Sequence, residues 1–381
     1  MHKPNHVDMV RILRGICLAI IALSSGVVQA QSGSFGFDGR LVVPDPHFDY
    51  LPIEIRLLND DFDGRTIAFT YTEGTGSNVV VFAVHLDSRA KRQIGEVPAG
   101  GSVDAVSADE SFLAGTLVVP GSKALSKADD VLKPDSGERK GEWMLRRFQA
   151  RLPMQLFTHD THSGEVRRFF STTDWLNHVQ MSPVDPTLLL FCHEGPWHLV
   201  DRIWTIRTDG SGLKSIQQRS MEMEIAGHEF FSADGQSIWY DLQTPRGEDF
   251  WVAGFEISTG ARTRYHLQRD SWSVHYTLSP DGTLFAGDGG DKGMVAHAED
   301  GKWIYLFRPE PVPVPAGPRP DAAGLIKTGV LRAERLVNMS RHNYHLEPNV
   351  RFSPDGKWVI FRSNMFGPTH VFEVEVAKAR P

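Results

Sequence analysis

Residues 191–210, FCHEGPWHLVDRIWTIRTDG, carry the densest group of chemically capable side chains in the sequence. This group contains His193, Glu194, Trp197, His198, Asp201 and Arg202. A histidine with a pKa near 6.5 can accept a proton at neutral pH, and arginine binds carboxylates through charge-assisted hydrogen bonds. A turn between two strands needs only one or two special residues, so this set favours a loop that faces a pocket. An ion-paired hairpin on the surface is the alternative.

Three later segments place a polar residue just ahead of a Ser-x-Asp motif. His228 lies in AGHEFFSADG, His275 in SVHYTLSPDG, and Glu347 with Asn349 in LEPNVRFSPDG. If the segments are equivalent parts of a repeated structure, these residues converge at one end of a central channel. Imidazole with carboxylate or amide oxygens suits Mn²⁺ or a similar divalent ion, and a histidine there could act as a general base. Structural hydrogen bonds within each repeat are the alternative.

These residues lie within a weak sequence repeat, and the strands that the repeat predicts would position them. An apolar residue, then Ser-x-Asp or Asp-Gly, then a short hydrophobic strand recur, with the aspartates at positions 63, 109, 185, 234, 281 and 355. Three of the gaps, 46, 49 and 47 residues, match one four-stranded propeller blade. The strands are short, rich in β-branched and aromatic residues, and separated by Gly, Asp and Asn turns. The pattern predicts an all-β single domain, a propeller of six or seven blades.

The two longer gaps contain additional segments. Residues 122–151 form a polar, lysine-rich insertion. Four of its residues could share one side of a helix: Trp143, Met144, Arg147 and Phe148. The proline-rich run 308–321 is predicted as an extended loop rather than an interdomain linker. We expect the chain ends to pair within one blade, which would join 35–37 and Leu41 to the last strands at 371–376.

The first 30 residues differ from the rest of the chain. Arg11 and Arg14 precede an apolar run at 16–23, and residues 28–30, Val-Gln-Ala, form a small-x-small cleavage site. These features predict a secretory signal peptide, with an uncleaved anchor as the alternative. Export is expected, to a periplasm if the source is a Gram-negative bacterium, with no stable membrane anchor after cleavage. The remaining chain, 31–381, would form the propeller.

Composition and charge narrow the function classes. The chain has 381 residues, 41% hydrophobic and 23% charged, which is ordinary globular composition. Its net charge is −7, and an acidic chain with no basic run argues against nucleic-acid binding. Cys17 leaves with the signal peptide, so Cys192 stands alone and is predicted as a small buried residue rather than a nucleophile. The sequence contains no G-x-S-x-G, H-E-x-x-H, C-x-x-C or phosphate-binding loop.

Several segments resemble the oligogalacturonate lyases, polysaccharide lyase family 22. They are residues 191–210, GHEFFSADG, SVHYTLSPDGTLFAGDGGD and EPNVRFSPDGKWVIFRSNMFGP, with RLPMQLFTHDTHSGE at 151–165. The resemblance spans roughly residue 48 to the end. It implies a seven-bladed β-propeller that cleaves short galacturonides by β-elimination during pectin degradation.

The resemblance also implies residue roles. The family's Brønsted base matches His228, and its catalytic arginine matches Arg202. Trp197 could stack on a sugar face, while His193 or His198 could bind a second carboxylate or hydroxyl. For Trp197 the alternative is a lid over its own hairpin.

The metal ligands that the resemblance implies differ at two positions. One ligand histidine matches His275, but the family pattern Gln-x-x-His-Pro-His becomes Tyr-x-x-Glu-Pro-Asn, so Glu347 and Asn349 replace two histidines. With His275 they could still hold Mn²⁺, and Ca²⁺ or Mg²⁺ are the alternatives. If the site binds no metal, His342 or His345 would contact the substrate directly.

The predicted reaction is elimination from a 4-linked uronide. His228 would remove the C5 proton, while Arg202 and a divalent ion neutralise the uronate carboxylate. The products would be unsaturated uronates that rearrange to 4-deoxy-5-keto forms. A lyase acting on a different uronide-containing oligosaccharide and a non-catalytic, exported carbohydrate-binding propeller are the alternatives.

Overall fold

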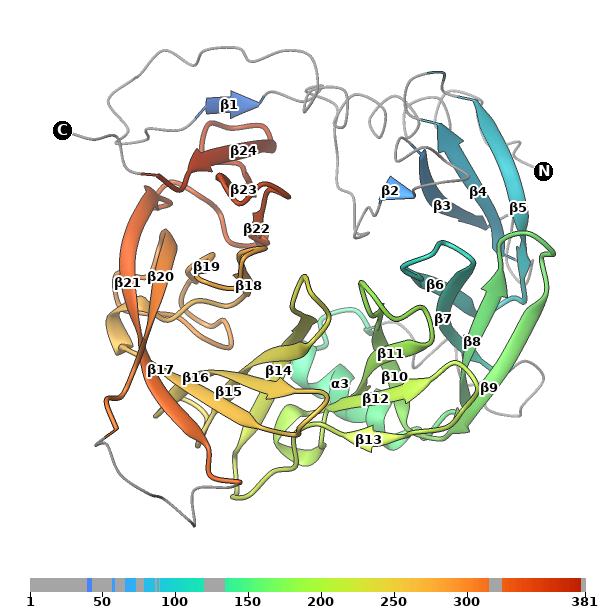
Figure 1. The fold of residues 1–381 in the computed structure, drawn as a ribbon, viewed down its shortest axis with the longest axis horizontal. Helices are drawn as coiled ribbons and strands as arrows, with labels where there is room; N and C mark the ends of the chain where they lie inside the picture. The colour runs from blue at the N-terminus through green and yellow to red at the C-terminus, as the bar shows by residue number, and fades with distance from the viewer. Residues whose placement is uncertain are drawn as a thin grey trace. The chain divides into compact units, whose positions relative to one another are not determined.

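The computed structural model describes residues 40–42, 57–58, 66–72, 79–85, 88, 90–119, 134–314 and 324–377. Strands dominate this part of the chain, and α3 (Lys140–Gln149) is its only α-helix. Two 3-10 helices, η2 (Trp197–Leu199) and η3 (Arg269–Ser271), interrupt the strands. No helix within these ranges is long and apolar enough to span a membrane. The all-β prediction is confirmed (Figure 1).

The chain divides into two compact units: residues 53–227, called the first unit, and residues 1–52 with 228–381, called the second unit. Among the described residues, the first unit holds three antiparallel sheets of four strands each, ordered as in the sequence. One sheet contains β2 (Leu57–Leu58), β3 (Thr66–Thr72), β4 (Val79–His85) and β5 (Lys91–Val97). The next contains β6 (Gly101–Val106), β7 (Phe112–Val118), β8 (Met154–Asp160) and β9 (Val166–Thr172). The third contains β10 (Trp175–Met181), β11 (Leu188–Glu194), β12 (Ile203–Arg207) and β13 (Lys214–Ser215).

The second unit holds the remaining two sheets. One has eight strands in the order β14-β15-β16-β17-β21-β20-β19-β18, and its two antiparallel halves join where β17 pairs in parallel with β21. Its first half contains β14 (Ile225–Phe231), which begins in the first unit, β15 (Ser237–Gln243), β16 (Phe250–Glu256) and β17 (Arg262–Leu267). Its second half contains β18 (Tyr276–Leu278), β19 (Phe285–Gly287), β20 (Trp303–Pro311) and β21 (Lys327–Asn338). The last sheet contains β22 (Arg351–Phe352), β23 (Trp358–Ser363), β24 (His370–Glu375) and β1 (Arg40–Val42).

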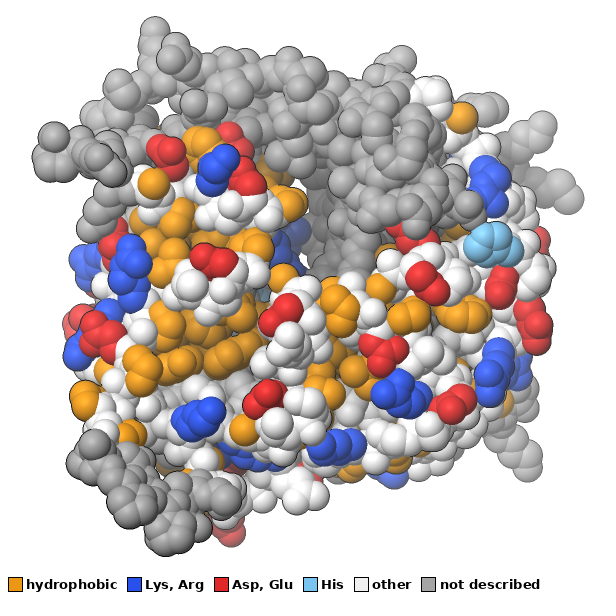
Figure 2. Space-filling view, viewed as in Figure 1, with side chains coloured by type: hydrophobic (Ala, Val, Ile, Leu, Met, Phe, Trp, Pro, Cys, Tyr) orange, Lys and Arg blue, Asp and Glu red, His pale blue; other side chains and the backbone are white. Residues whose placement is uncertain are grey.

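The sheets are packed on both faces. In β8 the adjacent residues Leu156 and Phe157 point to opposite sides, and both are fully buried. Leu190 and Phe191 show the same in β11. One hydrophobic cluster joins residues of β7 and β8 to residues of β10, β11 and β12, so the second and third sheets of the first unit share a core. Outside this core, the face in Figure 2 shows acidic and basic side chains interspersed.

The chain-end prediction is confirmed for Leu41. It pairs with Phe372, because β1 forms an antiparallel ladder with β24. Residues 35–37 lie outside the described residues, as do the predicted signal peptide and the repeat at Asp63. β1 therefore belongs to the same sheet as β22, β23 and β24, which come from the other end of the described chain.

The helix prediction for the 122–151 insertion is confirmed by α3. Its Trp143 packs edge-on against Trp175, with ring centroids 5.4 Å apart, and the Arg147 guanidinium lies 5.2 Å from the Trp175 ring centroid. Burial lowers the pKa of Arg147 to about 10. The helix therefore attaches the described end of the insertion to β10 through aromatic contacts.

The loop prediction for 308–321 is wrong at its start. Residues 308–311 continue β20 and pair with β21, with Pro309 opposite Leu331 and Pro311 opposite Gly329. The pairing between β19 and β20 stops at Phe307. Proline lacks an N–H group and is tolerated where one side of a strand has no partner strand, so the prolines mark an edge rather than a loop.

The predicted Ser-x-Asp turns join the first and second strands of their sheets. The Ser232 hydroxyl donates a 2.6 Å hydrogen bond to Asp234, and the Ser237 N–H donates back to the Ser232 oxygen at 2.9 Å. The hydrogen bond from each turn's own serine lowers the pKa of Asp234, Asp281 and Asp355 below the ordinary 3.8. The repeat is therefore a hydrogen-bonded turn in which the charged form of aspartate is favoured.

This turn chemistry predicts how stability depends on acid. A carboxyl whose pKa is lowered by folding stabilises the fold above its unfolded pKa, and that stability is lost as pH falls through the folded pKa. We expect the melting temperature to drop below about pH 3.8. Asp234→Asn should have a lower melting temperature at pH 7 and a smaller further loss between pH 5 and pH 3, measured by circular dichroism. Asp249→Asn, at an exposed position, serves as the control and should follow the wild type. Parallel curves for wild type and Asp234→Asn would contradict the prediction.

Candidate active site

A buried carboxylate orients His275 in the second unit. Asp288 follows β19, is fully buried, and accepts a 2.8 Å hydrogen bond from the His275 backbone N–H. Its other oxygen lies 2.7 Å from His275 Nδ1 and accepts a 3.2 Å hydrogen bond from the Asn349 N–H. Because a carboxylate only accepts, Nδ1 must carry the proton in this pair. The Nε2 atom of His275 is thereby directed away from Asp288.

Glu347 lies on the other side of the same ring. Its carboxylate oxygen is 3.8 Å from His275 Nε2, and 44% of its side chain is exposed. Burial by itself would lower the pKa of His275, but the charge and hydrogen bond of Asp288, with Glu347 and Asp241, raise it above its ordinary value. An imidazole nitrogen beside a carboxylate oxygen is a donor set for a divalent cation, and Asp288 supplies the outer partner that such a ligand histidine needs.

His228 adjoins this group on β14. Its ring centroid lies 4.5 Å from that of His275. Its Nδ1 is 3.3 Å from an oxygen of Asp241, a residue of β15 that is 2% exposed. His228 has a φ of +48°, in the left-handed region that L residues rarely adopt. Such a conformation costs of order 1–3 kcal/mol and persists where the surrounding structure imposes it, which happens often at functional sites.

The two aspartates are the site residues that the sequence reasoning missed. A positional signal marks them, because His228, His275 and Asn349 each lie four residues before the serine of their own turn. Asp241 and Asp288 each lie nine residues after that serine, Asp241 within β15 and Asp288 just after β19. Antiparallel pairing across the turn brings these two positions together. A search at fixed offsets from the turn would have found both carboxylates.

Arg202 lies in the first unit and forms a buried ion pair. Its side chain has no exposed surface, and it contacts the carboxylate of Glu194 at the end of β11. The Gly195 N–H donates a 3.0 Å hydrogen bond to the same carboxylate oxygen. The Trp197 ring covers the guanidinium, 4.3 Å from ring centroid to Cζ. A Cβ at Gly227 would lie 2.6 Å from that ring, so glycine is required for the close approach.

The loop predicted between the two strands, from His193 to Arg202, is shorter than expected, since β11 extends through Glu194. His193 points to the opposite side of β11 from Glu194 and stacks on Trp204, with ring centroids 4.9 Å apart. Its Nδ1 is 3.9 Å from a carboxylate oxygen of Asp174, and burial lowers the pKa of His193. The carbonyl of His198 accepts a hydrogen bond from Arg219. The substrate contacts predicted for His193, Trp197 and His198 stay predictions.

The site residues predicted from sequence thus fall into two groups. The second unit brings together the predicted base His228 and the predicted ligands His275 and Glu347, and it ties the Asn349 backbone to Asp288. The first unit brings together Arg202 and Trp197. The first group can move a proton and hold a cation.

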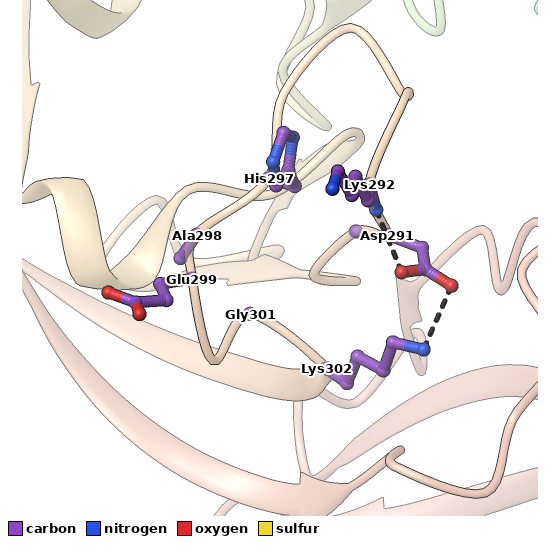
Figure 3. Close-up of a pocket in the computed structure, with 8 residues that line it drawn as sticks. Asp291, Lys292, His297, Ala298, Glu299, Gly301 and Lys302 are labelled. Carbon is purple, nitrogen blue, oxygen red and sulfur yellow. Dashed lines mark hydrogen bonds and ion pairs between the residues drawn. The ribbon is translucent and has the colours of Figure 1, made fainter.

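A cavity of about 210 Å³ lies along the loop that follows Asp288 (Figure 3). Its charged lining includes Asp291, Lys292 and Lys302. Lys302 Nζ is 2.8 Å from the Asp291 carboxylate, and the Lys292 backbone N–H donates to that carboxylate at 2.7 Å. The Asp291 carboxylate of this cavity is therefore already satisfied by the protein.

Comparison with known proteins identifies the family of this chain. The sequence model of the family described as oligogalacturonate lyase matches residues 141–379. The oligogalacturonide lyase of Pectobacterium atrosepticum is 26% identical over 239 residues, 58% of this chain and 55% of the relative. The oligogalacturonate lyase of Dickeya dadantii is 25% identical over the same shares. The matched part thus spans about half the length of these curated relatives.

Solved structures show the same fold. An oligogalacturonate lyase from Vibrio parahaemolyticus has a TM-score of 0.63 at 21% identity, covering 83% of this chain and 76% of that one. An oligogalacturonate lyase in complex with manganese has a TM-score of 0.67 at 18% identity, covering 93% of this chain and 96% of that one. Because the family's sequence model matches more than half of the residues, the chain belongs to the oligogalacturonate lyase family.

Proposed function

We propose that this protein is a lyase that cleaves short, 4-linked oligogalacturonides by β-elimination in pectin degradation. Besides family membership, one observation from the structure supports the proposal. Two histidine rings, His228 and His275, lie 4.5 Å apart, and each faces a buried carboxylate, Asp241 in β15 and Asp288 just after β19. This arrangement supplies a base and a cation-binding nitrogen side by side, which removal of a proton next to a carboxylate requires.

In this proposal His228 takes the C5 proton through Nε2. The carboxylate of Asp241 faces Nδ1 at 3.3 Å, so it favours the ring orientation that presents Nε2 and stabilises the imidazolium that forms. Arg202 keeps its predicted role, stabilising the negative charge that develops on the uronate carboxylate. The Glu194 carboxylate and the Trp197 ring hold the Arg202 guanidinium in one orientation. Because the Arg202 side chain has no exposed surface, the Trp197 ring would have to move aside for the uronate carboxylate to reach it.

The relative solved with manganese extends the proposal to a metal. The donors fit such an ion, because His275 Nε2 and a Glu347 oxygen lie 3.8 Å apart and Asp288 fixes the His275 ring. His275, Glu347 and Asn349 would hold Mn²⁺, with Ca²⁺ or Mg²⁺ as alternatives, since oxygen donors suit all three. When bound, the ion would act as a Lewis acid on the uronate carboxylate. Binding at Nε2 must displace the proton that the raised pKa of His275 favours.

We propose further that the fold is a seven-bladed β-propeller in a single domain, residues 31–381. Within the described ranges, six four-stranded groups result when the eight-stranded sheet is divided between β17 and β21, which supports a propeller. The seventh blade rests on the family resemblance. The first 30 residues are proposed to act as a signal peptide, so that the mature chain is exported, to a periplasm in a Gram-negative source. There it would meet small galacturonide oligosaccharides.

The test is the ultraviolet absorbance of the 4,5-unsaturated product, followed with di- and trigalacturonate as substrates. After EDTA treatment, we expect activity to be restored by Mn²⁺ in the wild type and to remain low in Glu347→Ala. Product from other uronides alone would move the substrate class to a different oligosaccharide. Binding of trigalacturonate without product under any metal would contradict the lyase proposal and favour a carbohydrate-binding propeller.

A further inference from the structure

In the first unit, His178 faces the carboxylate of Glu194, and a thiol joins this pair. His178 Nε2 lies 3.7 Å from Oε2 of Glu194, and Cys192 Sγ lies 3.9 Å from the same oxygen. The three ligand atoms are all within 4.8 Å of one another. Imidazole, thiolate and carboxylate are the three side-chain donors that Zn²⁺ takes in proteins.

Local structure directs these atoms toward one point. The ladder between β10 and β11 shifts register between Asn177 and Gln180, so His178 sits in a β-bulge with a φ of +51°. Bulges re-aim side chains and recur beside functional sites. Cys192 and Glu194 are two residues apart on β11 and therefore share one side of the sheet. His178 also lies four residues before its turn serine, the offset that His228 and His275 have in their own repeats.

The two oxygens of Glu194 have different partners. Oε1 accepts from Arg202 and from the Gly195 N–H, which leaves Oε2 as the oxygen that faces His178 and Cys192. Asp104, from a second bulge in β6, interacts electrostatically with His178. The carboxylates of Glu194 and Asp104 and a Cys192 thiolate carry three negative charges, and the Arg202 guanidinium offsets one of them. The two charges that remain match a divalent cation.

From this geometry we propose that His178, Cys192 and Glu194 form a binding site for Zn²⁺ or a similar borderline-soft divalent ion, with water as the fourth ligand. Zn–N and Zn–S bonds of about 2.0–2.3 Å in a tetrahedron place neighbouring ligand atoms roughly 3.3–3.6 Å apart. The two distances to Glu194 Oε2, 3.7 and 3.9 Å, need to close by only a few tenths of an ångström. His178 Nε2 and Cys192 Sγ, which lie within 4.8 Å of each other, need to approach by up to about 1.3 Å. His178 is 39% exposed, which gives the ion and the water access.

This site differs in kind from the one proposed at His275. Its thiolate selects Zn²⁺ over Mn²⁺, whereas the oxygen-rich set of Glu347 and Asn349 favours Mn²⁺, Ca²⁺ or Mg²⁺. The proposal therefore does not rest on lyase activity. It gives the buried Cys192 a role beyond packing.

Cobalt is the probe that tests the site, because Co²⁺ replaces Zn²⁺ and its bond to a thiolate gives an intense charge-transfer absorption. The full chain is treated with EDTA, titrated with Co²⁺, and then challenged with one equivalent of Zn²⁺. We expect a charge-transfer band that saturates near one Co²⁺ per chain and disappears when Zn²⁺ is added. His275→Ala should keep the band, since it alters the other proposed metal site.

Two variants each remove one proposed zinc ligand, and a third replaces a histidine outside the proposed site as the matched control. Cys192→Ser and His178→Ala should each abolish the band or weaken Co²⁺ affinity by at least tenfold. His178 is partly exposed, so its variant keeps the test valid if Cys192→Ser fails to fold. His162→Ala changes an exposed histidine of the same unit and should leave the titration unchanged. A wild type with no thiolate band, or a band that survives in His178→Ala, would overturn the proposal.

Discussion

Replacing His228 with asparagine should lower kcat on digalacturonate by about 10²–10⁴-fold, the usual contribution of a general base. Asparagine is the variant of choice because it tolerates the left-handed φ of +48° at this position, whereas alanine would add backbone strain. The amide cannot accept the C5 proton. The melting temperature should therefore stay near that of the wild type while turnover is lost, as measured by product absorbance and circular dichroism.

A second histidine in the same sheet serves as the control. Its replacement shows whether the loss of kcat comes from lost proton transfer or from any histidine substitution in this sheet. His266 lies on β17 of the same sheet, paired with Asp249 at 3.5 Å, and His266→Asn should retain wild-type kcat. Asp241→Asn should lower kcat less than His228→Asn, because it changes the orientation of the base without removing it. If His228→Asn turned over substrate at a rate within threefold of the wild type, another residue would have to be the base.

Much of the fold follows from local sequence pattern. The spacing of the Ser-x-Asp turns located five described turns between first and second strands, because a serine hydroxyl and an aspartate two or three residues later close such turns by themselves. The short hydrophobic run after each turn then predicted the strand that follows it. The continuation of β20 through Pro309 and Pro311 was missed because proline composition says nothing about which side of a strand lacks a partner.

The site was predictable in part for the same reason. His228, His275 and Asn349 hold equivalent positions ahead of their turns, so the repeat marked them together. Asp288 was missed, since only pairing across the sheet reveals that its carboxylate faces His275. Whether an aspartate can orient a histidine in this way depends on its burial, and burial depends on neighbouring sheets rather than on local sequence.

The pair of Arg202 and Glu194 shows this limit most clearly. Eight residues separate them, and both were predicted to lie in or beside a loop that faces a pocket. In the structure the Arg202 side chain has no exposed surface and that of Glu194 is 7% exposed. A charge in such a place is stable only with its partner, because each ion has lost its hydration.

Arg202→Met should therefore lower the free energy of unfolding by about 3–5 kcal/mol, since it leaves the Glu194 carboxylate buried without its ion-pair partner. The double variant Glu194→Gln with Arg202→Met should recover most of that loss, because it removes both charges together. Urea denaturation followed by circular dichroism measures both differences. Turnover should fall in both variants if the predicted role of Arg202 is right, even where stability is recovered.

Arg269→Met is the control that isolates the ion pair from aromatic stacking. The Arg269 guanidinium lies 3.9 Å from the Trp272 ring centroid, as Arg202 lies on Trp197, but Arg269 is exposed. Loss of an exposed cation–π contact costs no more than about 1 kcal/mol. Equal losses for Arg202→Met and Arg269→Met would mean that stacking, rather than the buried charge of Glu194, makes Arg202 indispensable to the fold. A loss at Arg202 several times larger, reversed by Glu194→Gln, would show that the carboxylate sets the requirement for arginine here.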